Sequence, residues 1–148
     1  MNGKVYSHTQ LGWMTILALD GAMVAVIVIT AALHAFVPGV WFVLAVLALA
    51  EVNFFSLAVS IDRERLRVAF GVGLIRITFP LSDLVRARTV RNPWYAGWGI
   101  RALGEGWLFN VSGVDAVEIE TRAGRKHRVG TDQPAALEAA IKTAIGLA

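Results

Sequence analysis

The chain has 148 residues, 56% of them hydrophobic, and a formal net charge of +3 at pH 7. A soluble domain averages about 45–50% apolar residues, so the excess predicts a segment embedded in a membrane. The absence of cysteine excludes disulfides, thiolate zinc sites and a cysteine nucleophile. The three histidines, His8, His34 and His127, are scattered, so the sequence predicts no metal site and no cofactor.

The first long feature is an apolar stretch from Gly21 to Ala50 that contains no charged side chain. A spanning helix needs about 20 apolar residues, so this stretch and its flanks are long enough for two crossings. Pro38 and Gly39 near its middle favour a turn. We expect a cytoplasmic N-terminal segment (1–10) and a transmembrane helical hairpin (11–59), with spans at about Leu11–Leu33 and Val40–Val59.

The distribution of basic residues predicts the orientation of this hairpin. Lys4 precedes the first span, a run of arginines follows the second, and the turn between the spans carries no Lys or Arg. The positive-inside rule then places both termini in the cytoplasm of a bacterial inner membrane. A cleaved signal peptide fits less well, because Asp20 interrupts the apolar run and the run greatly exceeds about 7–15 residues.

Two carboxylates lie inside the predicted spans. In a hairpin that turns near Val37, Asp20 and Glu51 fall at nearly the same depth. A carboxyl group within a bilayer costs several kcal/mol unless it is protonated or paired, so such residues are candidates for function. Three interpretations stay open: neutral or interface-seeking carboxyls, pairing with a basic residue of a partner helix, and a shared proton or ion site in a homo-oligomer.

From Ser60 onward the apolar residues alternate with polar ones, as in half-buried strands. The glycine-rich turns at 71–73, Ser112–Gly113 and Ala123–Gly124 separate some of these runs, and the last two are expected to be hairpin turns. About seven antiparallel strands in a barrel or sandwich follow from this pattern. The predicted strands are Arg65–Phe70, Ile75–Phe79, Leu84–Arg91, Gly99–Leu103, Trp107–Val111, Val114–Thr121 and Arg125–Val129.

The last segment predicts one amphipathic helix. Asp132 is a candidate N-cap, Pro134 suits the first turn, and Gly146 can end the helix. Its apolar stripe would close the open end of a small barrel, and Glu138 and Lys142 form an i,i+4 pair on the other side. The stripe consists of Leu137, Ile141, Ala144 and Ile145.

Seven strands followed by one helix is the order of the pleckstrin-homology (PH) fold. The runs IDRERLRVAFGVGLIRITFPLSDLVRARTVRNPWYAGWGIR and VSGVDAVEIETRAGRKHRVGTDQPAALEAAI resemble the bacterial PH-like domains that follow a two-helix anchor in small membrane proteins. The resemblance covers Ile61 to about Ile145. It implies a cytoplasmic, mainly-β PH-like domain over 60–148, capped by a C-terminal α-helix, and it transfers no specific function.

The most distinctive local segment is NPWYAGWGIR, Asn92 to Arg101. Glycines, aromatic rings and flanking arginines together are typical of hot spots in protein interfaces. Beside a bilayer the same rings could enter the headgroup layer, and in a sandwich they could instead fill the gap between two sheets. The candidate partner-binding residues are Trp94, Tyr95, Trp98, Arg91 and Arg101.

Arg63, Arg65 and Arg67 recur at period two and so share one face of a strand. They are candidates for binding anionic phospholipids, at about 1 kcal/mol each near a charged leaflet, or they form a solvated face. PH domains that bind phosphoinositides place basic residues around the first strand-to-strand loop, and the turn at 71–73 has none. The basic residues are interleaved with acids, which argues against nucleic acid as a partner.

These patterns predict a non-enzymatic accessory, scaffold or assembly subunit of an inner-membrane protein complex. It would bind another integral membrane protein through its helices and the Trp94–Trp98 segment. One alternative is a membrane-surface adaptor that binds anionic lipid, and a second is a small ion- or proton-handling oligomer built on Asp20 and Glu51. No serine lies in a pattern that indicates a catalytic triad.

Overall fold

The computed structural model describes residues 5–34 and 37–147, so the expectation for Lys4 lies outside the described residues. Nine strands, three α-helices and two short 3₁₀ turns make up this part of the chain. They are β1 (Tyr6–Leu11), α1 (Trp13–Ala32), α2 (Gly39–Phe54), β2 (Ser56–Ile61), β3 (Arg65–Phe70), β4 (Ile75–Pro80), η1 (Leu81–Asp83), β5 (Leu84–Arg91), η2 (Trp94–Ala96), β6 (Gly99–Ala102), β7 (Trp107–Asn110), β8 (Asp115–Thr121), β9 (Lys126–Gly130) and α3 (Pro134–Ala144).

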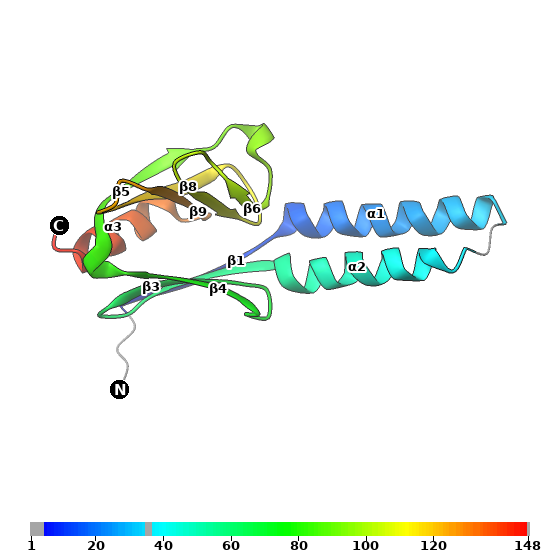
Figure 1. The fold of residues 1–148 in the computed structure, drawn as a ribbon, viewed down its shortest axis with the longest axis horizontal. Helices are drawn as coiled ribbons and strands as arrows, with labels where there is room; N and C mark the ends of the chain where they lie inside the picture. The colour runs from blue at the N-terminus through cyan, green and yellow to red at the C-terminus, as the bar shows by residue number, and fades with distance from the viewer. Residues whose placement is uncertain (1–4, 35–36, 148) are drawn as a thin grey trace.

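The strands form two sheets that face each other (Figure 1). Sheet A is an antiparallel sheet in the order β1-β2-β3-β4, and sheet B has the order β5-β8-β9-β7-β6. The helices α1 and α2 extend together from one end of the sandwich, while α3 packs between the two layers toward the other end. The predicted mainly-β domain with a C-terminal helix is therefore confirmed.

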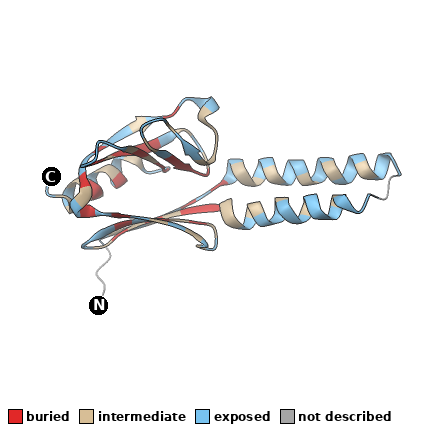
Figure 2. Cartoon of the chain, viewed as in Figure 1, coloured by how far each residue is buried: buried red, intermediate tan, exposed pale blue. Residues whose placement is uncertain are grey.

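The inner faces of the two sheets and one stripe of α3 make a single core. Alternate residues of β3 face inward, so Leu66, Val68 and Phe70 are fully buried while Arg65 and Arg67 are exposed. Phe70 and Phe109 meet edge to face across the sandwich, with ring centroids 6.4 Å apart. Figure 2 shows the same alternation, with the buried residues confined to the sandwich and absent from the described parts of α1 and α2.

The apolar helices are inserted between two paired strands. Leu11 pairs with Ser56 across β1 and β2, and the amide of Gly12 donates to the carbonyl oxygen of Phe55 at 2.7 Å. The predicted segment 1–10 therefore contributes a strand to the domain, and the predicted boundary at residue 60 cuts through β2. These assignments need correction because β1 is mostly polar and β2 continues the apolar run, so neither looked like a separate strand.

The two apolar helices differ in length. Helix α1 has 20 residues, a mean hydropathy of 2.2 and 6% of that segment buried, so it is long and apolar enough to cross a membrane. Helix α2 has 16 residues and ends at Phe54, not at Val59 as predicted. The helix ends early because the backbone of residues 56–61 is hydrogen-bonded to β1 and β3 as a strand.

Sheet B corrects two expectations about connectivity. Strand β7 pairs with β6 and, in parallel, with β9, whereas an all-antiparallel arrangement was predicted. The Ser112–Gly113 turn therefore connects β7 to a strand that is not its neighbour, because β8 lies between β5 and β9. The Ala123–Gly124 turn does join a true hairpin of β8 and β9.

Helix α3 follows the predicted pattern except at its first residue. Leu137 and Ile141 are fully buried, and Gly146 adopts a positive φ of 75° as the helix ends. Asp132 does not cap the helix: its Oδ1 lies 2.6 Å from Nε2 of His8 in β1, and Gln133 is the N-cap residue. The Asp132 side chain therefore links the start of α3 to the edge strand of sheet A.

Candidate functional site

Three loops of the domain surround the base of the two apolar helices. We call the segments 71–74, 92–99 and 110–114 the helix-facing rim (Figure 1). Hydrogen bonds join this rim to the helix-bearing segment: Gln10 Nε2 donates to the Ser112 carbonyl oxygen, and Thr15 Oγ1 donates to the Val111 carbonyl oxygen at 2.6 Å. The 110–114 segment of the rim is therefore attached at the level where the helices leave the sandwich.

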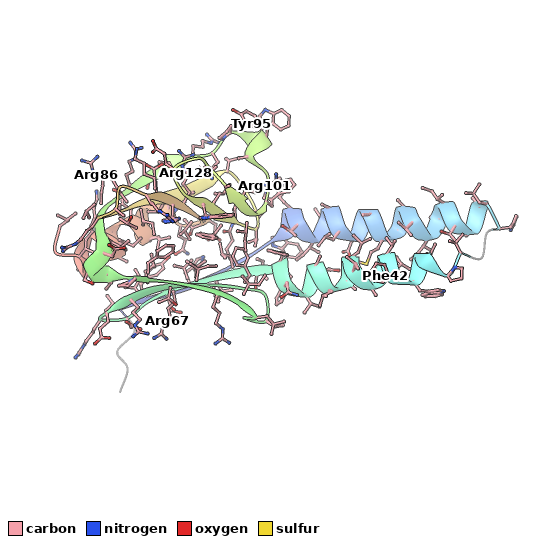
Figure 3. The ribbon with its side chains drawn as sticks, viewed as in Figure 1. Phe42, Arg67, Arg86, Tyr95, Arg101 and Arg128 are labelled. Carbon is pink, nitrogen blue, oxygen red and sulfur yellow. The ribbon has the colours of Figure 1, made fainter. Side chains whose placement is uncertain are left out.

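The aromatic loop, residues 92–99, is the most exposed part of this rim. Trp94 and Tyr95 are 83% and 73% exposed, and their rings meet edge to face with centroids 6.0 Å apart. Figure 3 shows Tyr95 projecting outward at the helix-facing end of sheet B. This exposure argues against the interpretation that these two rings fill the gap between the sheets.

The loop is rigid despite its exposure. Pro93 is the N-cap residue of the 3₁₀ turn η2, whose Ala96 amide donates to the Pro93 carbonyl oxygen at 2.9 Å. Gly97 has a φ of 71°, and a Cβ there would lie 3.0 Å from the guanidinium of Arg101. Arg101 Nε in turn donates to the Trp98 carbonyl oxygen at 3.2 Å. Two aromatic rings are thus presented to solvent on a braced backbone, which lowers the entropy cost of binding.

The other predicted partner-binding residues support the loop or lie beside it. Trp98 is half-buried, and Arg101 holds the loop through the contacts above. Arg91 is exposed, with its Nε 3.8 Å from Asp115 Oδ1 on the neighbouring strand. The structure therefore places Trp94, Tyr95 and Trp98 in one loop, with Arg101 on β6 against it and Arg91 at its base.

Arg63 and Arg65 do not lie near the helices, and Arg67 lies between them and the helix base. The three arginines start at the β2–β3 turn, at the opposite end of sheet A, and Figure 3 places Arg67 on the outer face of that sheet. Strand β2 spans about 17 Å at roughly 3.3 Å per residue, so Arg63 and Arg65 lie well away from the helix base. Arg67 is paired with Asp62 at 3.1 Å. The placement of Arg63 and Arg65 argues against their contact with the leaflet that the protein's own helices would enter.

Asp20 and Glu51 are not at equal depth. Counted from the Gly12–Phe55 hydrogen bond, Asp20 lies about 12 Å along α1 and Glu51 about 6 Å along α2, at 1.5 Å per residue. Neither side chain forms a hydrogen bond or salt bridge with another described residue. The structure therefore does not bring these two carboxylates together within one chain.

The β3–β4 turn carries rim residues that the sequence analysis did not single out as functional. Val72 and Leu74 are 57% and 74% exposed at its tip. Gly71, with a φ of 48°, lies so close to α2 that a Cβ there would sit 2.2 Å from the Val52 carbonyl oxygen. Behind the tip, Arg76 Nε donates to the Gly73 carbonyl oxygen at 2.5 Å. Apolar side chains in a turn, where polar ones are expected, are the signal that could have identified this feature.

A charge network covers the outer face of sheet B. Glu118 is buried, and its carboxylate accepts hydrogen bonds from Arg88 Nη2 at 2.6 Å and Arg128 Nε at 2.9 Å. Burial raises the pKa of Glu118, but the hydrogen bonds from the two arginines outweigh it and hold the pKa below its ordinary value. Arg128 Nη1 also donates to Asn92 Oδ1 at 3.0 Å, so the network extends to the base of the aromatic loop.

Comparisons with protein-family models, with curated proteins and with solved structures found no match. Within residues 5–34 and 37–147, no group of three or more His, Cys, Asp or Glu side chains is placed to hold a metal ion.

Proposed function

We propose that this protein is a membrane-anchored, non-enzymatic accessory or scaffold subunit of a bacterial inner-membrane complex. Its anchor would be the α1–α2 hairpin, and it would bind another integral membrane protein through these helices and the aromatic loop. The domain would have the PH-like fold that its sequence resembles. The observation that carries the proposal is an exposed apolar hairpin rooted in a rigid domain that presents two exposed aromatic rings beside it.

Pairing of β1 with β2 supports two crossings of the membrane. These strands are hydrogen-bonded neighbours, so the residues before α1 and after α2 lie on the same side of any membrane. If α1 crosses the bilayer, α2 must return across it. Its 16 residues span about 24 Å, somewhat less than the roughly 30 Å hydrocarbon core, so the adjoining residues would complete the crossing.

The polar side chains of the helices support the same anchor. Thr30 Oγ1 donates to the Val26 carbonyl oxygen, and Asn53 Nδ2 donates to the Leu49 carbonyl oxygen, as expected where water is absent. Asp20 is exposed on α1 and unpaired within the described chain. In a bilayer such a carboxyl is costly, and a basic side chain on the partner's helix would offset that cost. Under the positive-inside rule, the arginines after the second crossing favour a cytoplasmic location for both termini.

The test is a mild-detergent affinity purification of the tagged full chain from its native membrane, followed by mass spectrometry. A stoichiometric integral membrane protein should co-purify with the unaltered chain. Trp94→Ala and Tyr95→Ala should each reduce its recovery about tenfold or more, since exposed aromatic hot spots contribute about 2 kcal/mol or more. The matched control is Val85→Ala, an exposed apolar residue at the opposite end of β5.

Two outcomes would contradict the proposal. Recovery of the chain alone, or only with copies of itself, would remove the accessory role. Equal loss of the partner in the Trp94→Ala and Val85→Ala forms would show that the aromatic loop is not the contact. Asp20→Asn should also weaken recovery if the partner's helix supplies a cation.

A further inference from the structure

The outer face of sheet A contains a hollow next to the point where α2 enters the sheet. Ala58 and Ala69 lie side by side on this face, in one row of the β2–β3–β4 ladder that ends at Arg76. Because two neighbouring side chains are single methyl groups, the sheet surface is recessed there. The hollow has a volume of about 360 Å³ and reaches to the β3–β4 turn.

The charged side chains that line the hollow are all cationic. The next row of the ladder places Ser60, Arg67 and Thr78 side by side, so two hydroxyl groups flank a guanidinium. The residues that line the hollow include two arginines and no carboxylate. Arg67 is paired with Asp62 outside it, whereas Arg76 forms no ion pair with any residue in the described ranges. Arginines and hydroxyls around a recess are the donors that phosphate groups require.

Arg76 is held in position for such a ligand. Its Nε donates to the Gly73 carbonyl oxygen, so its terminal nitrogens are free to donate elsewhere. A Cβ on Gly73 would lie 3.1 Å from Arg76 Nη2, which shows how closely the guanidinium packs against the turn. A guanidinium fixed in this way loses little side-chain entropy when it binds an anion.

The position of the hollow selects the source of the phosphate. Gly71 contacts the last turn of α2, and the exposed side chains of Val72 and Leu74 lie at the tip of the same β3–β4 turn. If α2 leaves the bilayer at this level, the two apolar side chains meet the acyl region and Arg76 lies behind them at headgroup depth. The apolar side chains thus correspond to the acyl chains of a phospholipid, and the cationic side chain corresponds to its anionic headgroup.

We propose that the hollow bounded by Ser60, Arg67, Arg76 and Thr78 binds the phosphate headgroup of an anionic phospholipid from the adjacent leaflet. Val72 and Leu74 contact its acyl chains. The volume equals that of about a dozen waters, which accommodates a phosphoglycerol group. This inference rests on the proposed anchorage of the hairpin in the bilayer and is independent of the aromatic loop and its protein partner.

The experiment uses the full chain in mild detergent, titrated with phosphatidylglycerol or phosphatidylcholine and measured by native mass spectrometry. Arg76→Gln should weaken phosphatidylglycerol binding about fivefold and leave phosphatidylcholine binding unchanged, as expected for one cation near an anionic lipid. The matched control is Arg86→Gln, which removes the same charge from an exposed position on β5 and should change binding less than twofold. Thr78→Glu, which adds a carboxylate beside Arg67, should repeat the loss.

Further arms separate a lipid from a free anion. Leu74→Ser should also weaken phosphatidylglycerol binding, because a lipid needs the apolar tip and a free phosphate does not. The lipid assignment would be overturned if glycerol phosphate or inorganic phosphate bound as tightly as phosphatidylglycerol and Leu74→Ser left phosphatidylglycerol binding unchanged. Equal effects of Arg76→Gln and Arg86→Gln would overturn the site. Loss of the chain from the membrane fraction would instead contradict the proposed membrane anchor, on which this inference rests.

Discussion

Glu118 is the one carboxylate buried among the described residues, and its surroundings say how the outer face of sheet B is held together. Its two oxygens accept hydrogen bonds from arginines on the strands to either side, β5 and β9. A buried charge of this kind is stable only while its partners are present. Removing one member of the network leaves the opposite charge of another member without a partner.

Replacement of Glu118 by Gln should lower the free energy of unfolding by about 2 kcal/mol, since the amide cannot neutralise Arg88 and Arg128. The measurement is thermal unfolding of the full chain in detergent, followed by circular dichroism of the sheet. Glu120→Gln, two residues along the same strand, is the control and should change stability by less than about 0.5 kcal/mol. Equal effects of the two substitutions would show that the network contributes nothing specific.

The aromatic residues show what composition leaves undecided. The composition of the segment Asn92–Arg101 is compatible with core packing, a protein interface and contact with headgroups. Only the exposure of Trp94 and Tyr95 removes the first of these, because exposure depends on which strands lie beside the loop. Trp107, by contrast, is partly exposed on β7, and its neighbour Phe109 belongs to the core.

Among the elements, α3 is the one whose attachment has a defined pH dependence. Glu138 Oε2 accepts hydrogen bonds from the amide and the hydroxyl of Thr89 on β5, and Oε1 is bound by Lys142. Lys142 and then Thr89 lower the pKa of Glu138 to about 2. The predicted i,i+4 pair on the outer side of the helix therefore also joins the helix to sheet B.

The stability supplied by Glu138 should be present above about pH 4.5, the ordinary pKa, and be lost as the pH falls toward 2. The sign follows because a depressed folded-state pKa means that the unfolded chain binds the proton more readily. At pH 7 the Glu138→Gln form should be less stable than the unaltered chain by about 1 kcal/mol, a value reduced by solvent screening.

Melting temperatures of the two forms, measured from pH 7 to pH 2, test this dependence. The difference between them should shrink between about pH 4.5 and pH 2. A difference that stays constant over this range would mean that the Glu138 carboxylate does not hold α3 to β5. Thr143→Ser, an exposed position on the same helix, serves as a control that should not alter the pH profile.

For the whole molecule, the decisive feature is that the hairpin interrupts the sandwich. Strands β1 and β2 are neighbours in sheet A although 44 residues separate Leu11 from Ser56 in the sequence. Phe54, the last residue of α2, packs edge to face on Phe70 in the core, with centroids 5.4 Å apart. The hairpin and the domain are therefore joined by paired strands and by a core contact, and removal of the first 59 residues would take away β1 and most of β2.

A fragment of residues 60–148 should fail to fold, because it lacks β1 and most of β2 and exposes the inner residues of β3. In contrast, a chain in which Asn-Gly replaces residues 13–54 should fold without detergent, since this dipeptide forms the two-residue turn that joins paired antiparallel strands. Circular dichroism and thermal unfolding of both products check this expectation. Cooperative unfolding of the 60–148 fragment would refute it.

The sequence by itself determined the features that depend on local periodicity. Alternation predicted seven strands at nearly their observed positions, the 3.6-residue stripe predicted α3, and the apolar run predicted helices unlike those of a soluble core. Such patterns can be recognised in a sequence because each residue's environment is set by its neighbours in the same element. The early end of α2 could not be predicted from the sequence. Leu57, Val59 and Ile61 are apolar because they face the core of a strand, and a membrane span would require apolar residues at the same positions.

Only the tertiary structure decided which distant segments meet. Strand β1 has too few apolar residues to be recognised alone, and it becomes a strand because β2 offers it an unpaired edge. Pairing of β2 with β3 brings Gly71 against α2 and carries Arg63 and Arg65 to the far end of the sheet, and pairing of β3 with β4 places Arg76 near the helix base. Charge and composition are properties of the sequence, but the side of the molecule on which a charge lies depends on long-range pairing that no local pattern encodes.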